Sequence, residues 1–141
     1  MQFDISIYIL APAVAWLSAQ FLKYLFHVLK TKRFLEFTSL YMSGNMPSAH
    51  SATMVALTLA VGVGEGYQSA VFALSLVVTS IVIYDALQVR RAVGEQGKAI
   101  AKLLDKAKLS LRPYQALGHT PLEVAIGALV GAVAALATLS F

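Results

Sequence analysis

Long apolar segments alternate with short polar ones along the chain. Four apolar segments, at about residues 5–29, 47–63, 69–89 and 121–141, are predicted to be transmembrane helices. A helix rises about 1.5 Å per residue, so roughly 20 apolar residues are needed to cross a hydrocarbon core about 30 Å thick. The second segment, with 17 residues, reaches only about 26 Å, and we expect it to start below the membrane surface or to thin the bilayer locally. The fourth contains GALVG at residues 127–131, a GxxxG helix-packing pattern.

The link between the third and fourth segments has a different periodicity. Apolar residues recur there at helical spacing with lysines on the opposite side, which predicts an amphipathic helix over about residues 95–111. The apolar positions are Ile100, Leu103, Leu104, Ala107 and Leu111. Two arrangements are consistent with this pattern. The helix either lies on the inner leaflet, held by anionic lipids, or is solvated and packs its apolar stripe on its own bundle.

Composition is typical of an integral membrane protein. Of the 141 residues, 58% are hydrophobic and 13% are charged, whereas a soluble domain carries roughly 25% charged residues. The predicted fold class is therefore all-α, a membrane-embedded helical bundle that forms a single domain over residues 1–141. The absence of cysteine excludes disulfides and thiolate metal sites. No nucleic-acid partner is expected, because the basic residues are sparse and are not interleaved with aromatic ones.

Basic residues fall on one side of the predicted bundle. The links after the first and third segments hold Lys30, Lys32, Arg33, Arg90, Arg91, Lys98, Lys102, Lys106, Lys108 and Arg112, whereas the opposite side has only Asp4 and Glu65. By the positive-inside rule, both basic links are cytoplasmic and both termini are outside. The expected location is an inner membrane of the bacterial type or its equivalent. A cleaved signal peptide is not expected, because an acidic residue precedes the first apolar segment.

The other notable polar residues gather at the predicted cytoplasmic side. They are Lys23 and Lys30 toward the cytoplasmic end of the first segment, PSAH at residues 47–50, the pair Arg90 and Arg91, and GHTPLE at residues 118–123. This convergence predicts an anion site facing the cytoplasm. After Pro47, the N–H groups of Ser48 and Ala49 lack helical partners, and a helix N-terminus of this kind binds phosphate. The nearby lysines and arginines would neutralise the remaining charge of the phosphate.

Two histidines in these motifs are candidates for catalysis. His50 and His119 have the chemistry to supply a nucleophile and a general acid. Glu123 lies four residues after His119 and shares a helix face with it. A carboxylate in that position fixes the tautomer of the imidazole and stabilises its cation.

Several of these residues also have purely structural explanations. TPLE at residues 120–123 is a capping box with proline at the first helical position, in which Glu123 only caps. Ser48 is a small residue that lets helices approach, and Arg90 and Arg91 are ordinary anchors at a membrane surface. Asp85, just inside the third segment, needs a partner, which we expect to be an arginine or a lysine on the same side.

The order of the motifs resembles the type 2 phosphatidic-acid phosphatase superfamily, which includes the vanadium haloperoxidases. The signature of that superfamily is K-x6-R-P, then P-S-G-H, then S-R-x5-H-x3-D. Lys23-x6-Lys30 resembles the first block, with lysine for arginine and Thr31 for proline. PSAH matches the second with alanine for glycine, and His119-x3-Glu123 resembles the end of the third with glutamate for aspartate.

The resemblance is closer to a small divergent branch of the superfamily, related to acid phosphatases and vanadium-dependent haloperoxidases. It rests on GNMPSAHSA, YDALQVRRAVGEQ and LGHTPLEVAIGALVG and covers about residues 15–135. It implies a phosphatase that needs no metal or other cofactor. Four predicted spans are fewer than the usual six of the superfamily. This leaves either a minimal site or one completed by a second copy of the chain, so a homo-oligomer is among the expected assemblies.

The resemblance also implies roles for individual residues. His119 would be the nucleophile that forms a phosphohistidine, and Glu123 would orient it. His50 would protonate the leaving alcohol, Ser48 would hold a phosphate oxygen, and the two lysines of the first block would cradle the phosphate.

The arginine of the third block is missing from its usual place. It should stand six residues before the histidine, where this chain has Pro113. Arg112 is one position away, and Arg90 or Arg91 would replace it from the third segment. We favour the pair Arg90 and Arg91, because the YDALQVRR block carries them.

The sequence therefore predicts a metal-independent phosphohydrolase acting on a lipid phosphate of the inner leaflet. Candidate substrates are phosphatidylglycerophosphate, phosphatidate, and a polyprenyl phosphate or diphosphate. Two non-enzymatic interpretations stay open. One is a protein that binds or translocates a lipid phosphate without hydrolysing it, and the other is a structural subunit of a larger membrane complex.

Overall fold

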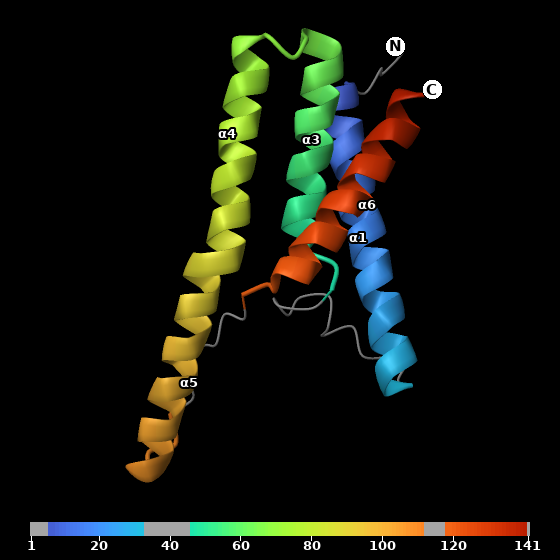
Figure 1. The fold of residues 1–141 in the computed structure, drawn as a ribbon. Helices are drawn as coiled ribbons and strands as arrows, with labels where there is room; N and C mark the ends of the chain where they lie inside the picture. The colour runs from blue at the N-terminus through green and yellow to red at the C-terminus, as the bar shows by residue number, and fades with distance from the viewer. Residues whose placement is uncertain (1–5, 33–45, 112–117, 141) are drawn as a thin grey trace, which may run out of the picture.

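The computed structural model describes residues 6–32, 46–111 and 118–140, and all regular structure within them is helical. The elements are α1 (Ile7–Thr31), α3 (Ala49–Glu65), α4 (Ala70–Tyr84), the π-helical turn η1 (Asp85–Val89), α5 (Arg90–Lys106) and α6 (Pro121–Leu139) (Figure 1). The predicted all-α class is confirmed.

Three helices begin with the same capping chemistry. The N-cap residues of α3, α4 and α6 are Ser48, Ser69 and Thr120, and each side-chain oxygen accepts the N–H three residues further on. Such caps satisfy a backbone donor that the first helical turn leaves without a partner. The short polar stretches between the apolar segments therefore fix where these helices start.

The bundle is centred on α3, which packs against α1, α4 and α6. Its core is made of alanines, including Ala52 and Ala56 on α3, Ala15 and Ala19 on α1 and Ala135 on α6. Small side chains let helix backbones approach closely, which increases van der Waals packing between helices in a membrane. A hydrogen bond of 2.7 Å between the hydroxyls of Thr58 and Thr79 links α3 to α4.

The GxxxG pattern of α6 forms the contact with α3. A Cβ atom built on Gly127 would overlap the carbonyl oxygen of Ser48, and one built on Gly131 would overlap that of Ala52. The pattern is therefore a packing motif, and the glycines bring the start of α6 against the start of α3.

This contact predicts a stability effect. Gly131→Ala should destabilise the bundle by about 1–3 kcal/mol, the usual cost of overpacking, because the methyl group meets backbone rather than a movable side chain. The midpoint of thermal unfolding in detergent measures this. Ala125→Val, which enlarges an exposed position of the same helix, is the control, and equal midpoints for the two variants would contradict the prediction.

Three helical stretches are long and apolar enough to cross a membrane: α1, the continuous stretch Ala70–Lys106, and α6. α3 is shorter, with 17 residues, and eight of them are buried. Large apolar side chains such as Phe21, Leu74 and Leu136 remain exposed on the outer faces of the bundle, where a membrane protein meets lipid. The predicted spans correspond to α1, α3, α4 and α6.

The helix of the third predicted segment continues past residue 89, where that segment was expected to end. α4, η1 and α5 form one stretch of 37 residues, which spans about 56 Å against roughly 40–45 Å for a bilayer with its headgroups. The sequence RRAVGEQGKAIAKLLDK has no proline and many strong helix formers, so the helix continues. α5 therefore extends away from the bundle (Figure 1).

The apolar stripe of α5 is exposed. Ile100 and Leu103 are 48% and 65% accessible to solvent, so this part of the stripe does not pack on its own bundle. Because α5 continues α4 as one helix of 37 residues, the described residues also show no separate helix lying along the leaflet, and contact of the stripe with lipid stays a prediction.

The first and last helices, α1 and α6, share one end of the bundle. The start of α1 and the end of α6 are at the end where α3 and α4 connect (Figure 1). Tyr8 of α1 donates a hydrogen bond of 2.6 Å to Glu65 at that end. The starts of α3 and α6, and with them PSAH and HTPLE, are at the opposite end.

Candidate active site

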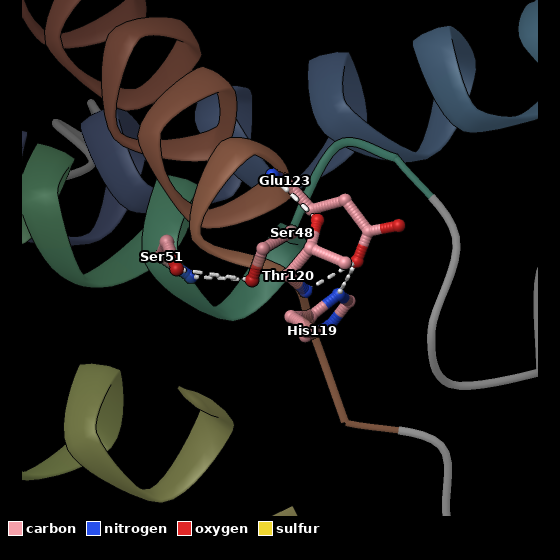
Figure 2. Close-up of polar contacts among 5 residues, drawn as sticks. All are labelled: Ser48, Ser51, His119, Thr120 and Glu123. Atoms are coloured by element: carbon pink, nitrogen blue, oxygen red, sulfur yellow. Dashed lines mark hydrogen bonds and ion pairs between the residues drawn. The ribbon is translucent and has the colours of Figure 1, made fainter. Parts of the chain in front are cut away.

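The start of α6 holds His119 through its own helix cap. The Thr120 hydroxyl accepts the N–H of Glu123 at 3.3 Å, and the Glu123 carboxylate accepts the N–H of Thr120 at 2.9 Å. The same carboxylate oxygen, Oε2, lies 3.1 Å from Nδ1 of His119. Figure 2 shows the carboxylate between these two residues. Glu123 thus does more than cap the helix, because the cap holds the carboxylate in contact with the imidazole; its role in orienting His119 for catalysis stays a prediction.

The His119 side chain is buried, with 4% of its surface exposed. Contact with a carboxylate favours a proton on Nδ1, which leaves the lone pair on Nε2. None of the described residues forms a hydrogen bond with Nε2, and the side chain lines a cavity of about 220 Å³ together with Arg91, Gly118 and Thr120. The imidazole therefore has one nitrogen held in place and one available for chemistry.

Burial is the main influence on the protonation of His119, which precedes the membrane-spanning part of α6. It lowers the pKa of His119 below its usual value, and the hydrogen bond and charge of Glu123 only partly oppose this shift. The positive charges of Lys23 and Arg90 lower this pKa further. The lowered pKa favours the neutral imidazole, which is the form a nucleophile requires.

This shift gives a prediction for the pH dependence. If the reaction needs neutral His119, the acid side of the kcat/KM profile should rise with pH, with a midpoint below about 6.5, the usual histidine pKa, and the profile should fall again where the general acid His50 loses its proton. Glu123→Gln removes the charge that raises this pKa, so the midpoint should move to still lower pH. A pH profile of lipid-phosphate hydrolysis tests both statements, and a midpoint above 6.5, or a shift to higher pH in the variant, would contradict them.

The start of α3 is tied to α6. Ser48 is fully buried, and its oxygen accepts hydrogen bonds from the N–H and the hydroxyl of Ser51 at 3.3 and 3.0 Å (Figure 2). Its N–H was expected to be available for an anion, but it donates to the carbonyl of Glu123 at 3.1 Å. That part of the prediction is wrong. Gly127 lets the start of α6 approach the start of α3 closely, and the carbonyl of Glu123 then accepts the N–H of Ser48. Contact of the Ser48 side chain with a phosphate oxygen remains a prediction.

Two lysines of α1 line a second cavity, which they share with Glu123. Lys23 is buried, with 6% exposed, and it lines a cavity of about 190 Å³ with His27, Lys30, Met46 and Glu123, among others. The negative charge of Glu123 acts on Lys23. Lys23 is therefore influenced by the same carboxylate that contacts His119, and Lys30 lines the same cavity as Lys23 and this carboxylate.

The adjacent residues Arg90 and Arg91 have different surroundings. Arg90 donates from Nε to Oδ2 of Asp85 at 2.6 Å, which is the partner expected for that carboxylate. Arg91 lines the same cavity as His119, and its backbone lies against Gly118, where a Cβ atom would clash. Arg112, the alternative arginine, lies outside the described residues.

His50, in the first turn of α3, is exposed and faces this group of charges. Arg90, His119, Lys23 and Asp85 all act on it electrostatically. Arg90 and Lys23 likewise act on His119. Side chains from α1, α3, η1, α5 and the start of α6 thus meet at one end of the bundle, and motifs up to 100 residues apart share a site.

Two features of this site were not predicted. The N–H of His119 donates to the carbonyl of Ala86 in η1 at 3.0 Å, and Gly118 allows the close contact with α5. The glycine directly before the histidine was visible in the sequence, but its contact depends on where α5 lies. In the described part of the chain, no group of three or more His, Cys, Asp or Glu side chains is arranged to hold a metal ion.

The fold and the apolar outer faces define an integral membrane protein with a polar, cation-rich site at one end. A family model described as "Divergent PAP2 family" matches residues 6–134, and the chain belongs to this family. It is also similar to the uncharacterized membrane protein YuiD of Bacillus subtilis (strain 168), with 32% identity over 139 residues, covering 87% of each chain. No solved structure matches the chain significantly.

Proposed function

We propose that the protein is a lipid-phosphate phosphohydrolase with His119 as its nucleophile. The observation that carries the proposal is the contact between Nδ1 of His119 and Glu123, which leaves Nε2 without a partner among the described residues. Positive charges from Lys23 and Arg90 act on the same imidazole. An anionic phosphate brought against Nε2 would meet cations that compensate its charge. Membership of the divergent PAP2 family is consistent with phosphatase-related chemistry.

The reaction would proceed in two steps. Nε2 of His119 attacks phosphorus, the bond between phosphorus and the leaving oxygen of the lipid breaks, and His50 gives that oxygen a proton. Water then attacks the phosphohistidine and gives its proton to His50, and the phosphorus–nitrogen bond breaks. The products are the dephosphorylated lipid and inorganic phosphate. Glu123 stabilises the positive charge that develops on His119 in the first step.

The substrate would be a lipid whose phosphate lies at the inner-leaflet surface. Phosphatidylglycerophosphate, phosphatidate, and polyprenyl phosphate or diphosphate all combine such a phosphate with a long apolar tail. The charge distribution supports this orientation, because the site shares its end of the bundle with the basic residues of α5.

Release of inorganic phosphate from these lipids tests the proposal. Purified protein should hydrolyse at least one of them with a chelator present, and orthovanadate, which mimics pentavalent phosphorus, should inhibit. Binding of a lipid phosphate without release would favour the non-catalytic binding or translocating protein. Neither binding nor release across the panel would favour a structural subunit.

The orientation gives a separate prediction. The chain has no native cysteine, so single cysteines report without background. In intact cells a membrane-impermeant thiol reagent should label Gln68→Cys, in the α3–α4 turn, and should not label Lys98→Cys on α5. Lysed cells are the control, since both positions are exposed and should then react. The reverse pattern in intact cells would place the site on the outer side and remove the support for inner-leaflet substrates.

A further inference from the structure

The π-helical turn η1 joins α4 to α5 beside the site. In an α-helix, side chains five residues apart point about 140° away from each other. In η1 the Arg90 N–H donates to the carbonyl of Asp85, and this five-residue spacing brings the two side chains onto the same side. The ion pair between Asp85 and Arg90 at 2.6 Å is a direct consequence.

The pair leaves the ends of the guanidinium available. Asp85 contacts Nε of Arg90, and no described residue forms a hydrogen bond with the two terminal nitrogens. A guanidinium held in this way keeps a pair of donors with the geometry to bind two phosphate oxygens. Arg90 is also the arginine whose charge acts on both His50 and His119.

The same turn anchors the nucleophile. In a regular α-helix the carbonyl of Ala86 would accept the N–H of Arg90, four residues on. In η1 that N–H goes to Asp85 instead, and the Ala86 carbonyl accepts the N–H of His119 at 3.0 Å. The glycine before His119 lies against the backbone of Arg91, so the loop and the helix are in direct contact.

We propose that η1 is the positioning element of the phosphate site, with Asp85 as the positioning residue that aims the terminal nitrogens of Arg90 at the phosphate bound beside His119. This inference rests on the proposed function, since it assigns Arg90 to the same phosphate. In this proposal, Arg90 is the cation that replaces the arginine missing from the third motif. π-turns inside α-helices are frequent at functional sites, in keeping with this role.

A simpler explanation is that Asp85 and Arg90 form an ordinary ion pair at the membrane surface. The two explanations predict opposite signs. If Asp85 is only a nearby negative charge, Asp85→Ala removes repulsion and should strengthen phosphate binding. If Asp85 aims Arg90, the same variant should weaken phosphate binding. Its effect on stability should be small in either case, because the pair is about 40% exposed.

The test measures binding of inorganic phosphate and of orthovanadate to purified protein by calorimetry, next to lipid-phosphate turnover. Asp85→Ala should weaken binding about tenfold, roughly the value of one charge-assisted hydrogen bond. Asp85→Asn, which keeps an oxygen acceptor, should weaken it less. In the Arg90→Ala background, Asp85→Ala should have no further weakening effect. Asp105→Ala, which removes one negative charge further along the same helical stretch, is the matched control and should leave binding unchanged.

Unchanged or tighter binding in Asp85→Ala, or the same loss in the presence and absence of Arg90, would overturn the inference. The binding readout separates this result from failure of the proposed function. Wild-type protein that binds phosphate in the Asp85-dependent way but hydrolyses no lipid refutes the phosphatase and leaves the positioning role standing. Wild-type protein that hydrolyses lipid phosphate but binds neither anion overturns the positioning role and leaves the phosphatase standing, and protein that does neither refutes both.

Discussion

His119→Ala should lower lipid-phosphate hydrolysis by on the order of 10⁴–10⁶-fold, the loss typical of removing a nucleophile. The side chain is buried at a cap that Thr120 and Glu123 form between themselves, so its removal leaves the hydrogen bonds that start α6 in place. The variant should therefore remain folded. Phosphate release and the midpoint of thermal unfolding, measured on the same preparation, separate lost chemistry from lost structure.

Two further variants calibrate that result. His50→Ala should cost about 10²–10⁴-fold, the usual contribution of a general acid, and most for poor leaving groups. Glu123→Gln keeps the capping box, because glutamine also serves at that position, and should lower turnover with little change in stability. Full activity in His119→Ala would contradict the mechanism.

The second large effect is expected at Arg90. Arg90→Ala should lower kcat/KM by about 10²–10³-fold, the cost of removing one donor that stabilises transition-state charge. Arg91→Ala should cost less, because the charge of Arg90 is the one that acts on both histidines. Arg112→Ala should cost least. Arg90→Lys should rescue poorly, since an ammonium cannot contact Asp85 and two phosphate oxygens with the same fixed geometry.

The opposite ranking, with Arg112→Ala the most damaging, would mean that the third motif is intact and shifted by one residue. The substrate concentration should be varied in each case. A change confined to KM would indicate that the arginine binds the substrate and the transition state equally.

The apolar segments predicted most of the fold because membrane helices are long and are clearly separated by short polar stretches. The starts of α3 and α6 agree closely with the predicted segments, since Ser48 and Thr120 cap them. The end of the helix that begins with α4 was harder to predict. Polar residues after residue 89 indicate the membrane boundary, but they do not indicate that a helix stops, and α5 continues without a break.

The candidate site was predictable as a set of residues and not as a geometry. The spacing of His119 and Glu123 was enough to predict their contact, and the capping box proved to be part of that contact. The choice between Arg90 and Arg91 depends on η1, because five-residue spacing places a partner of Asp85 at residue 90. No local sequence pattern marks a π-turn inside an apolar helix.

The most direct test of the central claim is to trap the phosphorylated enzyme. Wild-type protein mixed with a lipid carrying a radioactive terminal phosphate and quenched within milliseconds should carry an acid-labile, base-stable label. That label should map to the peptide containing His119, decay as inorganic phosphate appears, and be absent in His119→Ala. Hydrolysis by the wild-type protein with the label on another residue, or with equal labelling of His119→Ala, would contradict the account.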